Sequence, residues 1–433
     1  MTDTPITTAA SLWASVTRPA DSYTPLKGAK SVDCVVIGAG LTGLTAAHHL
    51  QKSGVTTLLI EAAEPGWGAS GRSNGQIIPA LNYDDLDELK NKHRAAGERF
   101  IALVRNSATT TFDLIRREGI DAEVEITGWI EAAVSGNDLR ALERRHTQWQ
   151  KHGAKSELLS RDDVAKKTGS TTWAGGWHLP LGGTVNPLAL VRGLAAAFVS
   201  AGGVIHNHTT ALSFGRAGTR WVTTTPQGRV DSRALILASN AYTDQFSKRL
   251  EPTLAREFVP VTAWQMATNP LNEQQRIGIL PSRAAITETA TPLSHLRIDA
   301  RQRLIIGGTG QLDANNRLQA VARTRLHQLV PSLAKSDPLK FEYQWSGITS
   351  QTSDRLPLVH TLGPDGVAWL GCNGRGLALA ASVGHELARA ITGTPQTDLA
   401  LPFTEPKPIS FHAIKRHGGI TNAIKAHLFT KSA

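Results

Sequence analysis

The sequence predicts an α/β protein in which a Rossmann-like nucleotide-binding domain carries an inserted second domain. A short apolar run, Val32 to Ile37, leads into the glycines Gly38 to Gly43, a helical pattern and a second apolar run that ends at Glu61. A continuous apolar strand pattern, Arg233 to Ala238, follows much later in the chain. The nucleotide-binding pattern is therefore divided, and other elements lie between its parts.

The first motif has a physical role for each of its parts if the ligand is a dinucleotide. Gly38 permits the tight strand-to-helix turn, Gly40 lets a pyrophosphate approach the backbone, and Gly43 lets the helix pack closely on the strand. The pyrophosphate then faces N–H groups at the positive end of the helix. Glu61 lies about 20 residues past the glycines, where an acid accepts hydrogen bonds from a ribose diol. The motif leaves NAD and FAD open, and a structural turn is the alternative.

Composition limits the classes of protein that remain. A length of 433 residues with 41% hydrophobic content suits two domains, or one large domain with insertions. No apolar run approaches the roughly 20 residues that span a bilayer, and no signal-peptide pattern opens the chain. The two cysteines, Cys34 and Cys372, exclude a disulfide framework, so we expect a cytoplasmic protein. The histidines show no ligand spacing, apart from His206 and His208 on one strand face, and we expect no metal.

The charge balance leaves two interpretations open. A net charge of +10 indicates either a basic surface or an anionic partner. Because no basic run is interleaved with aromatic residues, we expect no nucleic-acid partner. Cationic residues gather in the tail from residue 406 to 433, where Ile424 and Leu428 share a helical face. We expect a basic amphipathic helix there, which docks on its own protein or on a membrane surface.

Hydrophobic periodicity predicts the remaining elements. We expect helices over residues 90–117, 138–151, 186–201, 323–330 and 374–392, and strands over 123–134 (turning at Gly128), 203–214, 220–225, 259–268, 303–307 and 367–370. The predicted domains are an N-terminal extension (1–30), a nucleotide-binding domain (31–85, 150–250 and 346–405), a substrate domain (86–149 and 251–345) and the basic tail.

Three further motifs stand beside the first. They are Gly68 to Gln76 (GASGRSNGQ), Arg233 to Tyr242 (RALILASNAY), and a third that runs from Trp345 through Asp354 to Gly371–Gly376 (GCNGRG). Together the four motifs resemble the D-amino-acid-oxidase-like family of FAD-dependent oxidoreductases, of the glycine oxidase and sarcosine oxidase type. The resemblance covers about residues 11 to 405 and is closest to the gamma-glutamylputrescine oxidoreductase branch, which has a similar segment to Ser11–Leu26.

The resemblance implies a fold, a cofactor and a reaction. The fold would be an FAD-binding domain with an inserted substrate domain on a mixed β-sheet. The flavin would take a hydride from the carbon of a C–N bond in an amine or amino-acid substrate, giving an imine that hydrolyses. The electron acceptor, oxygen or a quinone or other carrier, stays open, and the basic tail is a candidate contact for it. The alternatives are an NAD-linked dehydrogenase and a flavoprotein of tRNA modification.

The resemblance also implies which residues bind FAD. Gly38 to Gly43 would hold the pyrophosphate, and the last motif would close over the flavin edge at a helix N-terminus. The full set is Gly38, Ala39, Gly40, Leu41, Thr42, Gly43, Glu61, Ala62, Gly68, Ala69, Ser70, Arg72, Ser73, Asn74, Gly75, Gln76, Ala211, Ala238, Ser239, Asp354, Asn373, Gly374, Arg375, Gly376 and Leu377. The second motif departs from the usual Arg-Asn-Gly-Gly. Since residues 68–76 hold no Cys or His, we expect non-covalent FAD, although Cys372 lies near the site.

Six residues are candidates for the substrate pocket. Arg297 would lie over the flavin and bind a substrate carboxylate, with a surface arginine as the alternative. Trp345, together with Trp264, would wall a pocket, with core tryptophans as the alternative. Tyr242 and Gln265 are further candidates, as is His178. Asp354 and Arg355 are expected to form a structural ion pair beside the flavin.

Overall fold

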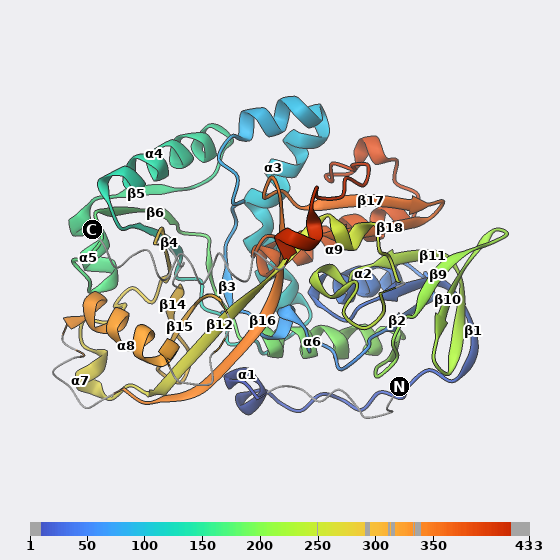
Figure 1. The fold of residues 1–433 in the computed structure, drawn as a ribbon, viewed down its shortest axis with the longest axis horizontal. Helices are drawn as coiled ribbons and strands as arrows, with labels where there is room; N and C mark the ends of the chain where they lie inside the picture. Colours follow the sequence, from blue (N-terminus) through green and yellow to red (C-terminus); the bar gives the residue numbers. More distant parts are fainter. Residues whose placement is uncertain are drawn as a thin grey trace.

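The computed structural model describes residues 10–248, 250–290, 295–310, 312, 317–331, 333 and 339–416. Two large sheets form the molecule (Figure 1): a nucleotide-binding sheet flanked by α2 and α9, and a second sheet flanked by α8. This arrangement confirms the predicted α/β fold with mixed sheets.

The first sheet has the strand order β17-β18-β11-β1-β2-β8, with β10 and β9 attached beyond β11. The pairs β1·β11, β1·β2, β2·β8 and β11·β18 are parallel, as a nucleotide-binding sheet requires. The strands are β1 (Gly28–Ile37), β2 (Thr57–Ile60), β8 (Val204–His206), β9 (Ser213–Ala217), β10 (Arg220–Thr225), β11 (Gly228–Leu237), β17 (Leu358–Gly363) and β18 (Gly366–Leu370).

Helices α2 (Leu41–Lys52) and α9 (Gly376–Ile391) pack together on one face of this sheet. Alternate residues of β1 explain the two-sided burial, since Cys34 and Val36 join the helical core whereas Val35 and Ile37 join a second core with Trp221. Helices α3 (Leu86–Arg117) and α6 (Pro187–Ser200) cover the same helical side.

The second sheet has the order β16-β12-β15-β14-β13-β4-β6-β5 and is mixed, because β13 and β4 pair in parallel while the other pairs are antiparallel. One face packs under α8 (Arg317–Leu329), and the other faces the nucleotide-binding sheet. The strands are β4 (Trp129–Ala133), β5 (Glu157–Leu159), β6 (Gly175–Leu179), β12 (Phe258–Pro270), β13 (Ala285–Glu288), β14 (His295–Ile298), β15 (Arg303–Thr309) and β16 (Phe341–Thr352).

The strand pairing divides the chain differently from the predicted domain limits. Strands β5 and β6 lie within the predicted 150–250 segment but pair in the second sheet, and β16 crosses residue 346. The remaining elements are α1 (Leu12–Val16), β3 (Gln76–Ile77), β7 (Gly183–Thr184), α4 (Gly136–Lys151), α5 (Arg161–Thr168) and α7 (Glu273–Arg276). Helix α6 begins as expected, because the Asn186 side chain accepts a hydrogen bond from Ala189 N at 3.1 Å.

Three predicted elements were wrong in detail. The strand expected over 203–214 breaks after His206, because the chain leaves β2 there and re-pairs with β10 from Ser213. In the 123–134 region only β4 is a strand, and Glu125 makes an isolated bridge to Thr184. Helix α3 is interrupted at Arg94, where φ is +50°. The tail helix expected near Ile424 lies outside the described residues. No helix within the described ranges is long and apolar enough to cross a membrane.

Candidate functional site

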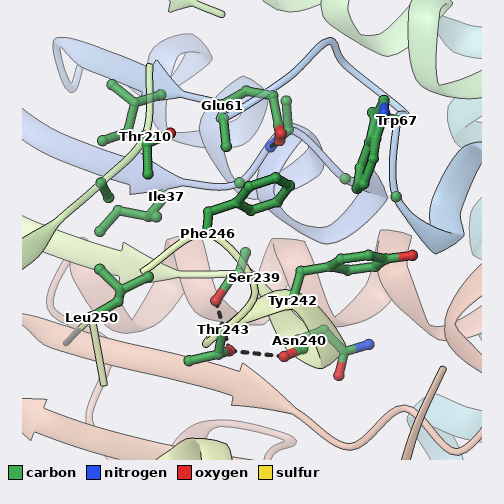
Figure 2. A pocket seen from close by; sticks show the side chains of 18 of the residues that line it. Ile37, Glu61, Trp67, Thr210, Ser239, Asn240, Tyr242, Thr243, Phe246 and Leu250 are labelled. Carbon is green, nitrogen blue, oxygen red and sulfur yellow. Dashed lines mark hydrogen bonds between the residues drawn. The ribbon is translucent and has the colours of Figure 1, made fainter. Parts of the chain in front are cut away.

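A cavity opens at the carboxyl ends of β1, β2 and β11, beside the N-terminus of α2 (Figure 2). Eleven of the predicted cofactor residues and one predicted catalytic residue line it: Gly38, Ala39, Gly40, Glu61, Ala62, Gly68, Ala69, Ser70, Ala211, Ala238, Ser239 and Tyr242. Leu41, Thr42 and Gly43 form the first turn of α2 behind the lining. Ala211 lies between strands rather than in one, as the break after β8 requires.

The glycines shape the entrance to α2. Gly38 has φ +108°, and a Cβ added at Gly43 would lie 2.0 Å from the Gly38 carbonyl oxygen. A Cβ at Gly40 would press on Ser70 Oγ at 3.0 Å. The N-cap residue Gly40 has no side chain to cap the helix, and Ser70 Oγ accepts a hydrogen bond from Leu41 N at 3.1 Å. The positive end of α2 faces the cavity, whose lining includes Gly40 and Ser70. This geometry suits the pyrophosphate that the motif predicts.

Glu61 ties the turn together from the end of β2. Its Oε2 accepts a hydrogen bond from Ala39 N at 2.7 Å, and its Oε1 accepts one from Ala63 N at 3.0 Å. Burial raises the pKa of Glu61, although these backbone N–H groups oppose the rise. Each carboxylate oxygen keeps a further lone pair that is available to a ribose hydroxyl. The contact with the ribose stays a prediction.

Aromatic side chains that the sequence reasoning missed wall the cavity. The Trp67 ring lies 5.7 Å from the Tyr242 ring and 5.4 Å from the Phe246 ring, and Figure 2 shows the three beside one another. The Arg72 guanidinium lies 4.4 Å above Trp67. Trp67 stands between Gly66 and Gly68, directly before the second motif, and this pair of glycines was a usable signal. Phe246 follows an irregular turn, and no local pattern indicates it. The other lining residues that were missed are Ile37, Ile60, Gly66, Thr209, Thr210, Asn240, Thr243, Ser247 and Leu250.

The second-motif segment, Arg72 to Gln76, is held by side chains of the second sheet. Trp345 Nε1 donates to the Arg72 carbonyl at 2.9 Å, and Asn74 Nδ2 donates to Gln265 Oε1 at 2.8 Å. Trp13 of α1 donates to the Ser73 carbonyl at 2.9 Å. Two predicted catalytic residues, Trp345 and Gln265, therefore meet at the predicted flavin-contact motif.

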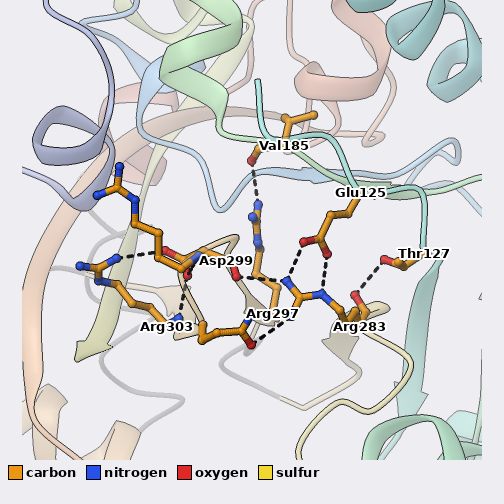
Figure 3. Close-up of polar contacts among 9 residues, drawn as sticks. Glu125, Thr127, Val185, Arg283, Arg297, Asp299 and Arg303 are labelled. Carbon is orange, nitrogen blue, oxygen red and sulfur yellow. Dashed lines mark hydrogen bonds and ion pairs between the residues drawn. The ribbon is translucent and has the colours of Figure 1, made fainter. Parts of the chain in front are cut away.

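Arg297 of β14 also contacts this segment. The side chain is 1% exposed, which excludes the surface alternative. Its Nη1 donates to the carbonyls of Asn74, Gly75 and Val185 at 3.2, 3.1 and 2.7 Å, and Figure 3 shows the contact with Val185. Burial lowers the pKa of Arg297 to about 10, so the group stays a cation at neutral pH. A role in binding a carboxylate stays a prediction.

The second-motif segment carries buried polar atoms with no partner. Among the residues that the structure describes, Arg72 Nη2, Ser73 Oγ and Asn74 Oδ1 are buried and make no hydrogen bond. Buried polar atoms are normally satisfied, so three consecutive exceptions indicate a missing polar partner. The polar edge of a flavin ring fits this donor and acceptor set.

The third motif places Asn373 and Arg375 at the N-terminus of α9. Asn373 has φ +49°, and its Oδ1 accepts a hydrogen bond from Thr352 N at 2.9 Å. Gly374, Gly376 and Leu377 complete the turn into the helix. The expected ion pair of Asp354 with Arg355 was wrong, because Asp354 instead lies 3.9 Å from Lys92 Nζ.

His178 and Trp264 lie away from the predicted flavin contacts, whereas Cys372 directly precedes Asn373 of the third motif. His178 on β6 contacts Glu157 at 2.9 Å, and Trp264 packs in the core under α8. Cys372 is buried, and Asn240 Nδ2 lies 3.2 Å from its Sγ. Within the described part of the chain, no three His, Cys, Asp or Glu side chains are grouped as metal ligands.

A family model described as "FAD dependent oxidoreductase" matches residues 33–390. The chain belongs to this family. The membership decides between NAD and FAD in favour of FAD, and the unpartnered atoms of Arg72, Ser73 and Asn74 fit that cofactor.

Relatives span most of the chain. Gamma-glutamylputrescine oxidoreductase of Escherichia coli (strain K12) is 26% identical over 379 residues, which cover 86% of this chain and 87% of the relative. Glycine oxidase of Geobacillus kaustophilus is 23% identical, covering 75% of this chain and 83% of the relative. Its solved structure has a TM-score of 0.72 at 20% identity and covers 88% of this chain and 99% of that chain. L-proline dehydrogenase from P. horikoshii has a TM-score of 0.71 at 18% identity, covering 88% and 98%. The structural likenesses show a shared fold.

Proposed function

We propose that this protein is an FAD-dependent oxidoreductase that oxidises the C–N bond of an amine or amino-acid derivative. One observation carries the proposal: the second-motif segment has buried polar atoms without partners, and Gln265 and Trp345 of the second sheet hydrogen-bond to this segment. The resemblance to gamma-glutamylputrescine oxidoreductase and glycine oxidase supports the substrate class.

The residues of the chain would position the reactants. Bound FAD would supply a hydride acceptor, and the resulting imine would hydrolyse in water. Trp345 and Gln265 would fix the second-motif segment through the hydrogen bonds that they make to it. The first turn of α9 would present positive N–H dipoles toward the ring edge. A substrate amine held neutral and close to the ring would react without a protein nucleophile.

Arg297 has two roles open to it. The family resemblance implies that it anchors a substrate carboxylate. Its three hydrogen bonds to backbone carbonyls favour a positioning role, in which it holds Asn74 and Gly75 in place. The two roles differ in whether a carboxylate-free substrate is affected when Arg297 is replaced.

Anaerobic reduction of the bound flavin tests the proposed reaction. We would mix the holoprotein with primary amines, N-substituted amino acids and proline, and record bleaching of the flavin absorbance. At least one amine should bleach the flavin and yield an aldehyde or keto acid. Bleaching by 2-hydroxy acids or by NADH, with no response to any amine, would refute the proposal.

The electron acceptor and the location belong to the same proposal. We propose a cytoplasmic enzyme whose basic tail approaches a membrane or an electron carrier. Phe411 and Ile414, in the described part of the tail, are 78% and 71% exposed, beside Lys415. The full chain should therefore sediment with vesicles of anionic lipid at low salt, and a variant that ends at Glu405, before the tail, should sediment less. Equal sedimentation of the two would remove the tail from this role.

A further inference from the structure

The chain that precedes β1 is attached near both ends of the proposed cofactor site. This N-terminal strap, residues 11–27, lies outside the region that the family model matches, which begins at residue 33. Figure 1 shows it running along one side of the molecule from α1 to β1. Near β1, the Leu26 N–H donates to Thr209 Oγ1 at 3.0 Å, and Thr209 lines the cofactor cavity. At the other end, α1 contacts the second-motif segment.

Polar contacts hold the strap between these two ends. Thr17 Oγ1 donates to Asn186 Oδ1 at 3.2 Å and accepts a hydrogen bond from Asn186 Nδ2 at 3.1 Å, at the start of α6. His206 Nδ1 lies 2.7 Å from the Thr24 carbonyl oxygen. The strap therefore has a defined path, which fixes where α1 meets the second-motif segment.

Trp13 of α1 is one of three side chains that hold the carbonyl groups of the second-motif segment. Trp345 Nε1 donates to the Arg72 carbonyl and Trp13 Nε1 donates to the Ser73 carbonyl, each at 2.9 Å. Arg297 Nη1 donates to the next two carbonyls along the chain, at 3.2 and 3.1 Å. Four consecutive carbonyls thus each accept a hydrogen bond from a side chain that is distant in the sequence.

These hydrogen bonds also orient the N–H groups of the segment. The C=O and N–H groups of a trans peptide point in opposite directions, so each anchored carbonyl turns the following N–H away from its anchor. Among the residues that the structure describes, the N–H groups of Ser73, Asn74 and Gly75 make no hydrogen bond. Buried backbone donors are normally satisfied, so three consecutive free N–H groups suit the polar edge of a flavin ring.

The Trp13 ring is held by the other two anchors. It is 0% exposed and packs in a small core cluster that includes Leu188 and Ile305. Its centroid lies 6.0 Å from that of the Trp345 ring, and the Arg297 guanidinium lies 5.4 Å from it. Removing only its N–H would therefore release one carbonyl of the segment while the neighbouring carbonyls keep their donors.

We propose that the N-terminal strap is part of the flavin site and that Trp13 is the positioning residue through which it acts. Trp13 would fix the peptide between Ser73 and Asn74, so that the Asn74 N–H is in place for the flavin. The inference rests on the proposed function and adds a segment that the matched family region does not include. Donors held in position stabilise the negative charge of a reduced flavin without reorganising when the charge arrives.

The test removes the N–H of Trp13 and compares it with a matched tryptophan. Trp13→Phe keeps an aromatic ring in the cluster and loses the donor. Trp221→Phe is the control, because Trp221 Nε1 donates to the Pro364 carbonyl at 3.0 Å and the Arg216 guanidinium lies 5.4 Å from its ring. Trp221 is also buried, on β10. We would measure Tm, the flavin midpoint potential and the visible spectrum of each FAD-loaded protein. For an amine that bleaches the flavin, we would add the limiting rate of anaerobic reduction and the apparent Kd.

Trp13→Phe should lower the midpoint potential by about 30 mV, which is a tenfold change in the equilibrium constant of a two-electron couple. The limiting rate of reduction should fall roughly tenfold, and the apparent Kd of the amine should stay within about threefold. Trp221→Phe should leave the potential, spectrum and rate unchanged, even where it lowers Tm. Trp345→Phe, which releases the neighbouring carbonyl, should shift the potential in the same direction.

A merely structural role for Trp13 gives a different result. If Trp13→Phe lowers Tm but keeps the wild-type potential and spectrum, the inference is overturned. A shift in Trp345→Phe without one in Trp13→Phe would overturn it as well, because the segment would then be held without the strap. Should Trp13→Phe fail to retain FAD, 3-benzothienylalanine in place of Trp13 keeps the size of the ring and lacks the N–H, so its potential decides.

The potential and the spectrum separate this inference from the proposed function, since neither measurement needs an amine. If no amine bleaches the flavin, the proposed function fails, and a lowered potential in Trp13→Phe still supports the strap. If amines bleach the flavin at the wild-type rate in Trp13→Phe, with an unchanged potential, the inference falls and C–N oxidation stands.

Discussion

Single glycines set the shape of the cofactor cavity, and Gly40 gives the sharpest test. It is the N-cap of α2 and lines the cavity, and a Cβ there would already press on Ser70 Oγ at 3.0 Å. A leucine side chain would extend into the space that the motif reserves for the pyrophosphate. We expect Gly40→Leu to abolish FAD binding, measured as flavin released per folded chain.

Gly215 provides a control for the general effect of replacing a glycine. Gly215 in β9 has an ordinary backbone conformation and no heavy atom within 4 Å of an added Cβ. Gly215→Ala should therefore keep full FAD content. A folded Gly40→Leu protein with stoichiometric FAD would show that Gly40 does not contact the pyrophosphate.

Also at the residue scale, a buried ion pair between His360 and Glu257 helps to hold the C-terminal segment at Thr404. His360 Nε2 lies 2.7 Å from Glu257 Oε2, and His360 Nδ1 lies 2.6 Å from the Thr404 carbonyl oxygen. Burial alone would lower the pKa of His360, but the hydrogen bonds and charge of Glu257 outweigh it, so the pKa is raised. A histidine whose pKa is raised in the folded state stabilises the fold at pH values below its ordinary pKa of about 6.5. This stabilisation is lost as the pH rises through the folded-state pKa.

The pH dependence of unfolding checks this pair. We expect His360→Gln to cost about 3–5 kcal/mol at low pH, because it leaves the buried Glu257 carboxylate without its imidazolium partner and with only the hydrogen bond from Lys407 N. The difference in Tm between wild type and variant should be largest below about pH 6.5 and should shrink above it. A difference that grows with pH would contradict the assignment. Glu257→Gln should show the same trend.

At the scale of elements, α2 and α9 must approach closely to bring both predicted cofactor-binding turns to one edge of the sheet. A Cβ at Gly384 of α9 would lie 2.8 Å from the Thr42 carbonyl oxygen and 2.7 Å from Thr45 Cβ. Alanine gains up to about 1 kcal/mol of helix propensity. Overpacking costs about 1–3 kcal/mol, and backbone atoms cannot move aside cheaply. We therefore expect Gly384→Ala to lower the free energy of unfolding and to weaken FAD binding.

Gly136 provides the control for that substitution. It begins α4, and the nearest heavy atom to an added Cβ is 4.0 Å away. Gly136→Ala should leave both the free energy of unfolding and FAD affinity within about 0.5 kcal/mol of the wild type. If Gly384→Ala were equally neutral, the contact between α2 and α9 would be looser than described.

The helices and strands show how much of the fold and of the site could be predicted from the sequence. The first unit, Val32 to Glu61, was predicted because strand, turn and helix are each encoded by neighbouring residues. The break after His206 was not, because it depends on β9 pairing with β10 instead of continuing beside β2. Trp13 and Arg297 contact the second-motif segment only through long-range packing. Local periodicity carries no information on which distant side chains will meet.

For the whole molecule, bound FAD is the element expected to join the two sheets. Its adenosine end would occupy the cavity beside Glu61, and its flavin end would lie against the second-motif segment, which Gln265 and Trp345 of the second sheet hold. A ligand that binds only the folded state stabilises by about 2.7 kcal/mol at a hundredfold excess over Kd. Removing FAD should therefore lower Tm, and adding it back should restore Tm.

Adding FMN to the apoprotein separates the stabilisation that comes from the adenosine end of FAD from that of the flavin end. FMN lacks the adenosine that would fill the cavity at Glu61, so FMN at the same concentration should restore little of the lost Tm. Acid should release the flavin from the wild type intact as FAD, because Cys372 Sγ is buried beside Asn240 and no Cys or His lies in residues 68–76. Scanning fluorimetry of the apoprotein with FAD, with FMN and with ADP measures each contribution. Full recovery with FMN would place the binding energy at the flavin ring and leave the Glu61 end of the cavity without the ligand that its motif predicts.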